Sequence, residues 1–118
     1  MREIKFRAWN KQTRRMEDVR QINFFDSEML NGNSEWYSLR HTELLQYTGL
    51  QDKNGIEIYE GDIVSWKNKD EDTLKYAKVF FEDGAFRLYN TYFELKSYEN
   101  LAVIGNIYEN PKLLENEK

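Results

Sequence analysis

The sequence predicts a mainly β protein, built as a small barrel or a sandwich. Short apolar or alternating runs recur about every 8–12 residues, and turn-forming residues separate them. The 118 residues include 6 glycines and 1 proline, and each glycine stands alone between expected strands. Aromatic residues make up 15% of the chain, so the core is expected to depend on Phe, Tyr and Trp.

The N-terminal part is expected to form strands joined by polar turns. Charged and apolar residues alternate over residues 4–9, which is typical of a half-buried strand. Residues 10–15 are polar and indicate a turn, and a second strand is expected over residues 16–25. Residues 26–35 are rich in Asn, Ser and Gly and are expected to be a loop. The pattern of residues 36–47 fits a short helix or a strand.

The clearest element is a hairpin over residues 75–89 that turns at Asp83–Gly84. A two-residue turn there puts Phe81 opposite Phe86. Four apolar residues then share one face of the hairpin, which is therefore expected to be buried: Val79, Phe81, Phe86 and Leu88.

Other elements of the C-terminal part follow from turn and strand signals. Residues 52–55, Asp-Lys-Asn-Gly, predict a hairpin turn, because the Asn-Gly pair at its end accepts positive φ. Short apolar runs predict strands over residues 63–66 and 101–104, and residues 68–73 read as a polar loop. Asn110–Pro111 is expected to start a short terminal helix, with Asn as N-cap and Pro at the first helical position.

The net charge of −4 conceals an asymmetry between the two parts of the sequence. Residues 1–20 carry seven bases and three acids, a net charge of +4, and residues 21–118 carry −8. A basic segment on an acidic chain can bind nucleic acid, or it can match acids within the fold. The second interpretation is favoured, because a nucleic-acid-binding domain is usually basic throughout and this chain has a pI near 5.1.

If the basic segment makes an external contact, its strand face is the best candidate. On the expected first strand, two bases and a tryptophan lie opposite the apolar residues, and two arginines follow in the turn. Such a face could stack bases and meet phosphates, or contact another protein. The candidate contact face consists of Lys5, Arg7, Trp9, Arg14 and Arg15.

Composition excludes many kinds of catalytic and metal site. The absence of cysteine excludes disulfides, thiol nucleophiles, iron–sulfur clusters and cysteine-bound zinc, and the one histidine, His41, excludes any site that needs two. The sequence has no glycine-rich phosphate loop and no G-x-S-x-G elbow. The carboxylates of residues 70–72 read as solvated charge, and Asp62 is expected to tie down a turn. No catalytic residue, metal ligand or cofactor is therefore nominated.

No membrane or export signal is found in the sequence. The N-terminal residues lack a continuous apolar segment, and no apolar run is long enough for a transmembrane helix. A soluble protein that stays in the cytoplasm, without a membrane partner, is therefore expected.

Segments in four parts of the chain carry a resemblance to a known family. In chain order they are Ile4–Trp9, Leu45–Val64, Val79–Gly84 and Val103–Pro111. Together they closely resemble the YopX family of small proteins encoded by bacteriophages and prophages. The long central segment is specific, and the stretch over residues 21–40 departs most from the family pattern.

The resemblance implies a single domain in three parts. Residues 1–44 would hold additional N-terminal strands and the variable region, residues 45–110 an SH3-type small β-barrel, and residues 111–118 the terminal helix and tail. The family brings no established activity, catalytic residue or cofactor.

Three functional hypotheses remain open from the sequence. The first is a non-enzymatic accessory protein that binds a host or phage protein, or assembles with copies of itself. The second is a nucleic-acid-binding module that uses the candidate contact face. The third and most remote is a carboxylate- or metal-dependent hydrolase, for which the chain offers few distinctive ligands.

Overall fold

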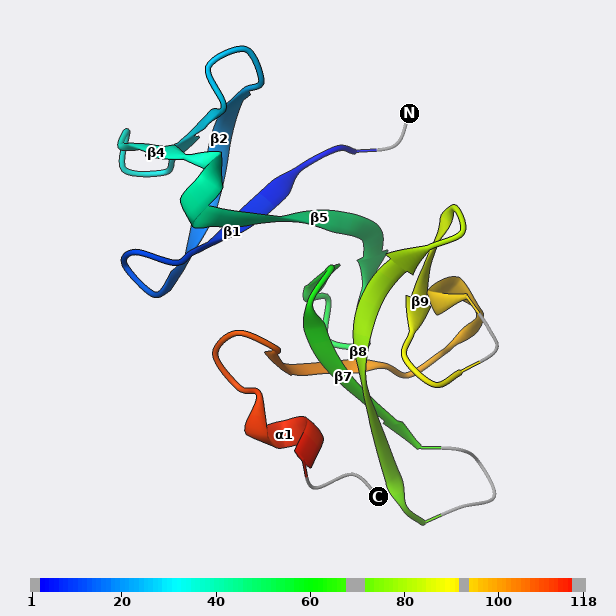
Figure 1. Cartoon of the computed structure of the whole chain (residues 1–118). Helices are drawn as coiled ribbons and strands as arrows, with labels where there is room; N and C mark the ends of the chain where they lie inside the picture. The colour runs from blue at the N-terminus through cyan, green and yellow to red at the C-terminus, as the bar shows by residue number, and fades with distance from the viewer. Residues whose placement is uncertain (1–2, 68–71, 92–93, 116–118) are drawn as a thin grey trace. The chain divides into compact units, whose positions relative to one another are not determined.

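The fold was obtained as a computed structural model, which describes residues 3–67, 72–91 and 94–115 (Figure 1). The chain forms two compact units, Met1–Tyr47 and Thr48–Lys118, and strand β5 runs through the boundary.

The first unit is built from strands of one antiparallel sheet. The sheet has six strands in the order β4-β3-β2-β1-β5-β6, so β1 is a central strand with β2 and β5 as neighbours. The short 3₁₀ helix η1, Leu39–His41, connects β4 to β5. The strands that lie in or enter this unit are β1 (Phe6–Asn10), β2 (Arg15–Asn23), β3 (Glu28–Asn31), β4 (Trp36–Ser38) and β5 (Thr42–Gln51).

The second unit contains a four-stranded antiparallel sheet in the order β10-β7-β8-β9. Strand β6 belongs to the other sheet, in which it is the neighbour of β5. The elements of this unit are β6 (Glu57–Tyr59), β7 (Asp62–Lys67), β8 (Leu74–Glu82), β9 (Ala85–Leu88), η2 (Leu95–Ser97), β10 (Ala102–Asn106) and α1 (Lys112–Glu115).

The expected fold class is confirmed at the level of the elements. The chain is mainly β, with N-terminal strands ahead of the C-terminal part and one short helix near the C-terminus. Within the described residues, the two sheets are open and do not close into a barrel. The SH3-type barrel that the resemblance implied is therefore not confirmed.

One expected loop of the first unit is wrong. Residues 26–35 are not a loop throughout, because they contain β3, which pairs with both β2 and β4. Met29 in this strand is fully buried and makes the strand part of the core. The ambiguous segment 36–47 forms β4, η1 and the first part of β5, so it is mostly extended.

The hairpin of the second unit has the predicted register. Phe81 pairs with Phe86, and Val79 with Leu88. The two residues of the second pair are each 1% exposed, but Phe81 is 52% exposed. The expectation that all four are buried is wrong, because the Phe81–Phe86 pair lies nearer the tip of the hairpin, next to Glu82 and Ala85.

The core of the second unit is one cluster drawn from both sheets and the connecting segments. Val64 and Trp66 of β7 both belong to it, as the alternation of that strand predicts. The buried members are Ile58, Val64, Trp66, Ala77, Val79, Leu88, Leu95 and Leu101.

The C-terminal helix forms, but not with the expected side-chain cap. The backbone N–H of Leu113 donates to the carbonyl of Asn110, whereas the Asn110 side chain accepts from the N–H of Asn106 at 3.2 Å. Leu113 and Leu114 are half-buried, which fits their expected docking role. Residues 116–118 of the expected tail, and residues 68–71 of the expected polar loop, lie outside the described residues.

Candidate functional site

Most buried polar side chains of this fold are asparagines and aspartates at the ends of strands. The Oδ1 atom of Asn10 accepts from the N–H groups of Gln12 and Thr13 at 2.9 and 3.2 Å. The Oδ1 atom of Asn31 likewise accepts from the two residues at positions 33 and 35, and that of Asn106 from residues 108 and 109. Such bonds tie a turn to the strand before it. These buried groups therefore serve the fold.

Glu17 connects two of these turns within the first unit. Its carboxylate accepts from Asn10 Nδ2 at 2.7 Å and from Asn31 Nδ2 at 3.0 Å, one bond on each oxygen. Glu35 accepts a second bond from Asn31 Nδ2, at 3.0 Å. The network holds side chains that the sequence spaces 14 residues apart.

Asp52 of the second unit is a buried carboxylate that accepts three backbone N–H groups, and it is only 7% exposed. One oxygen accepts from the N–H groups of Asn54 and Ile56 at 2.8 and 2.9 Å, and the other from the N–H of Val103 at 2.9 Å. Burial raises the pKa of Asp52, but these three donors and the charge of Lys53 lower the pKa by more, so it lies below its ordinary value. Asp52 is thus a charged clasp between its own turn and β10.

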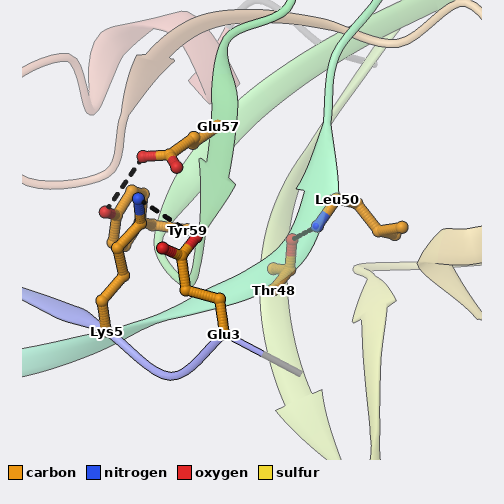
Figure 2. Close-up of polar contacts among 6 residues, drawn as sticks. All are labelled: Glu3, Lys5, Thr48, Leu50, Glu57 and Tyr59. Carbon is orange, nitrogen blue, oxygen red and sulfur yellow. Dashed lines mark hydrogen bonds and ion pairs between the residues drawn. The ribbon is translucent and has the colours of Figure 1, made fainter. Parts of the chain in front are cut away.

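Asp62 has the structural role that the sequence predicted. Its carboxylate is 1% exposed and accepts from the backbone N–H of Tyr59 at 2.8 Å, across the turn at Gly61. Other polar side chains of this unit also bond locally: Figure 2 shows the Leu50 N–H donating to the Thr48 hydroxyl at 3.2 Å, and Tyr59 beside Glu57. The Thr48 hydroxyl donates to the Ile58 carbonyl at 2.7 Å, and the Tyr59 hydroxyl donates to Glu57 at 3.4 Å.

The candidate contact face is only partly accessible. Trp9 is 8% exposed, so its ring offers almost no surface for stacking. Lys5 lies just before the central strand β1 and Arg7 lies in it, and both are half-buried. Arg14, in the turn that follows, and Arg15, the first residue of β2, are exposed. Of the five predicted residues, the two arginines are exposed and the tryptophan is buried. The alternation of the sequence predicts which face of a strand a residue lies on, but not whether that face is covered.

Acids of the first unit lie beside several of its bases. Lys5 Nζ lies 3.4 Å from Glu3 and 4.9 Å from the centre of the Tyr47 ring (the Lys5–Glu3 ion pair is drawn in Figure 2). Lys11 Nζ lies 3.0 Å from Glu43. These contacts support the interpretation that the basic N-terminal charge is matched within the fold.

Arg7 also has an acid as its cross-strand partner, because β1 pairs it with Asp18 of β2. Opposite charges in directly paired positions stabilise a sheet.

No metal or histidine site is assembled in the described part of the chain. Across residues 3–67, 72–91 and 94–115, no three His, Asp or Glu side chains group so that they could hold a metal ion. His41 is exposed at the end of η1. Asp72 is fully exposed and lies 3.5 Å from Lys67, and the other two carboxylates of the acidic loop lie outside the described residues.

The second unit has an open pocket of about 410 Å³ with a mixed polar and apolar lining. Its size is within the range of small-molecule sites. Two carboxylates line it, Asp52 and Glu99, and that of Asp52 already accepts three backbone N–H groups. Residues that line it include Leu50, Ile58, Leu95, Leu101, Lys53 and Lys96.

Two adjacent phenylalanines, which the sequence did not point to, are highly exposed in the described part of the chain. Phe24 is 76% exposed and Phe25 is 96% exposed, in the turn between β2 and β3. We name residues 24–27 the aromatic turn. The sequence predicts a strand that runs to Phe25, on which Phe24 and Phe25 would lie on opposite faces. In the structure β2 ends at Asn23, so both rings lie in the turn and are exposed.

Hydrogen bonds at its base fix the aromatic turn. Asn23 Nδ2 donates to Asp26 at 3.0 Å, and the backbone N–H of Asp26 donates to Asn23 Oδ1 at 3.0 Å. Ser27 has a φ of 54°, and its carbonyl accepts from the N–H of Leu39 at 2.8 Å. The two rings are therefore carried by a bonded turn.

The fold and these features define a small protein of two antiparallel sheets whose buried polar groups hold turns. The chain belongs to the YopX protein family, whose family model matches residues 5–115. A crystal structure of protein EF1440 from Enterococcus faecalis is similar, with a TM-score of 0.73 and 27% identity over 97% of this chain and 99% of that one. The crystal structure of protein yopX from Bacillus subtilis shares the fold, with a TM-score of 0.60 and 24% identity over 100% of both chains. No curated protein sequence matches the chain.

In the described residues, no helix is long and apolar enough to cross a membrane.

Proposed function

We propose that this YopX-family chain is a non-enzymatic accessory protein of a bacteriophage or prophage that binds another protein through its aromatic turn. The 96% exposure of Phe25 carries the proposal. A single exposed apolar residue is ordinary on a protein surface, but adjacent exposed rings on a fixed turn mark a contact site. The partner is a host or phage protein, or a second copy of the chain.

The chemistry of the aromatic turn suits a protein partner. Aromatic residues are enriched at protein interfaces, where a few buried rings supply most of the binding energy. The hydrogen bonds between Asn23 and Asp26 hold the turn before binding, so less conformational entropy is lost when the rings are buried.

A nucleic-acid-binding function is the alternative, and the exposure of Arg14 and Arg15 favours it. Two guanidinium groups can meet phosphates, and such binding weakens steeply with salt. The burial of Trp9 removes the ring that would have stacked on bases, so this function ranks second.

Two variants distinguish these functions, because one removes the exposed rings and the other reverses the exposed charges. The tagged wild type, a Phe24→Ser/Phe25→Ser variant and an Arg14→Glu/Arg15→Glu variant would each be incubated with nuclease-treated bacterial lysate, and retained proteins would be identified by mass spectrometry. We expect a defined set of proteins on the wild type and on the arginine variant, and their loss from the phenylalanine variant. Equal retention by the phenylalanine variant would contradict the proposal.

The same variants test the alternative directly. Binding to single- and double-stranded DNA and RNA at low salt would be measured for all three proteins. Binding that is lost only in the arginine variant would establish the nucleic-acid function in place of the proposed one.

A further inference from the structure

The chain contains Asn-Gly steps in two very different environments. An asparagine followed by glycine can cyclise, because the glycine N has no neighbouring side chain to hinder its attack on the asparagine side chain. The steps are Asn31–Gly32 in the first unit and Asn54–Gly55 in the second.

The Asn31 side chain is fixed at every polar atom. It is 1% exposed, its Oδ1 accepts two backbone N–H groups at 2.9 Å, and its Nδ2 donates to Glu17 and Glu35 at 3.0 Å. Rotation of this amide toward the Gly32 nitrogen would break all four bonds and leave buried groups unsatisfied.

The Asn54 side chain is free of such restraint. Asn54 and Gly55 are both exposed, and within the described residues the Asn54 side-chain amide makes no hydrogen bond. Gly55 has a φ of 80°, which places this step in a tight turn. The Gly55 N–H donates to the Asp52 carbonyl at 3.0 Å, and this exposed bond must open before the nitrogen can react.

We propose that Asn54 is a site of spontaneous deamidation and isoaspartate formation in the folded protein, and that the fold protects Asn31 from the same reaction. The Gly55 nitrogen loses its proton to solvent base and bonds to Cγ of Asn54, and the Cγ–Nδ2 bond breaks to release ammonia. Water then opens the cyclic imide at one of its two carbonyls. One opening gives aspartate, and the other gives isoaspartate, whose main chain is longer by one methylene.

The modification would act on the clasp formed by Asp52. The carboxylate of Asp52 accepts from the N–H groups of Asn54 and Ile56, on either side of the reacting bond. An added methylene in this turn displaces at least one of these donors, and aspartate or isoaspartate adds a negative charge two residues from Asp52. We expect the modified protein to melt at a lower temperature than the fresh protein.

The test ages the folded full-length chain in mildly alkaline buffer at physiological temperature. A glutamate-specific protease then releases residues 29–35 and 44–57 as separate peptides, which report on Asn31 and Asn54. Mass spectrometry detects the amide-to-acid change, and an isoaspartyl methyltransferase detects isoaspartate. We expect modification at Asn54 at least about ten times faster than at Asn31, as the hydrogen bonds of Asn31 require.

Two controls complete the experiment. In urea the Asn31 peptide should react at a rate similar to the Asn54 peptide, because unfolding removes its protection. An Asn54→Gln variant should keep its melting temperature on ageing, while the wild type loses stability. Equal rates at the two sites in the folded chain, or no reaction at Asn54, would overturn the proposal.

Discussion

Individual Asx residues stabilise the turns of this fold by accepting backbone N–H groups. Asp52 is the strongest example, since its carboxylate joins its own turn to Val103, which lies 51 residues away in sequence. Hydrogen bonds to a charged acceptor contribute more to stability than bonds between neutral groups. The sequence showed a turn at this position, but not the distant strand that the carboxylate holds.

Asp52→Asn is expected to lower the free energy of unfolding by about 1–3 kcal/mol near neutral pH. The amide can still accept from Asn54 and Ile56, but its nitrogen cannot accept from the Val103 N–H, which is left without that partner. Urea unfolding measures the effect. Glu99 is an exposed carboxylate that lines the same 410 Å³ pocket as Asp52. Glu99→Gln is therefore the matched control and should change stability little.

Acid is expected to remove the contribution of Asp52 to stability. Because the pKa of Asp52 is lower in the folded chain, its contribution is fully present above the unfolded pKa of about 3.9 and is lost as pH falls through the folded pKa. The stability difference between wild type and Asp52→Asn should therefore shrink below about pH 4. A difference that stays constant from neutral to strongly acidic pH would contradict the assignment of a lowered pKa.

Gly105 lies too close to a neighbouring side chain to carry a Cβ atom. A Cβ there would lie 2.6 Å from Asn110 Oδ1, whereas a Cβ at Gly32 would lie 3.5 Å from its nearest neighbour, in Asp18. Gly105→Ala should cost about 1–3 kcal/mol, and Gly32→Ala no more than about 0.5 kcal/mol. Denaturant midpoints of the two variants provide the comparison, and equal losses would show that the close approach to Asn110 is not restrictive.

Among the elements, the β8–β9 hairpin depends on a turn with two left-handed residues. Asp83 has a φ of 53° and Gly84 a φ of 78°. Gly84→Ala is expected to destabilise the chain by about 1 kcal/mol, because a side chain disfavours this conformation. Asp83→Asn should be nearly neutral, since Asn also adopts it readily. Thermal unfolding of the two variants tests this contrast. An equal loss of stability in both would show that the left-handed conformation of Gly84 is not the cause.

Sequence reasoning predicted this hairpin well because local signals determine it. The turn pair Asp83–Gly84 sets the register, and side-chain alternation then pairs Phe81 with Phe86. Burial was harder to predict, since it depends on how far the core reaches along the strands. Phe81 lies on the same face as the buried Val79, but it lies beyond the end of the core and is 52% exposed.

Strand β3 was missed for a different physical reason. It has four residues, and residues typical of turns follow it, so local propensity favours a loop. Pairing with β2 and β4 and the burial of Met29 override that propensity. Because β3 was not predicted, the aromatic turn between β2 and β3 was not predicted either.

For the molecule as a whole, the charge asymmetry of the sequence is mostly absorbed by the fold. Residues 1–47 carry eight bases and seven acids, so the first unit is close to neutral. Lys5 and Lys11 lie beside acids, and the exposed bases in the first turn and at the start of β2 are Lys11, Arg14 and Arg15. The rings of Phe24 and Phe25 are more exposed than any other large apolar side chain of the described residues.

Stability and partner binding should therefore separate in a variant of the aromatic turn. Phe25→Ser should leave the free energy of unfolding within about 0.5 kcal/mol of the wild type, because a side chain that is 96% exposed contributes little to the core. Urea unfolding of this variant checks the expectation. A larger loss would mean that Phe25 serves the fold and not a partner.

Site-specific crosslinking at the aromatic turn tests directly whether this turn binds another protein. Phe25 would be replaced by photoreactive p-benzoylphenylalanine, and the exposed hairpin residue Glu82 would be replaced in the same way as a control. After illumination in bacterial cells, we expect a discrete protein adduct from position 25 and none of the same mass from position 82. The absence of any adduct from position 25, or the same adducts from both positions, would contradict it.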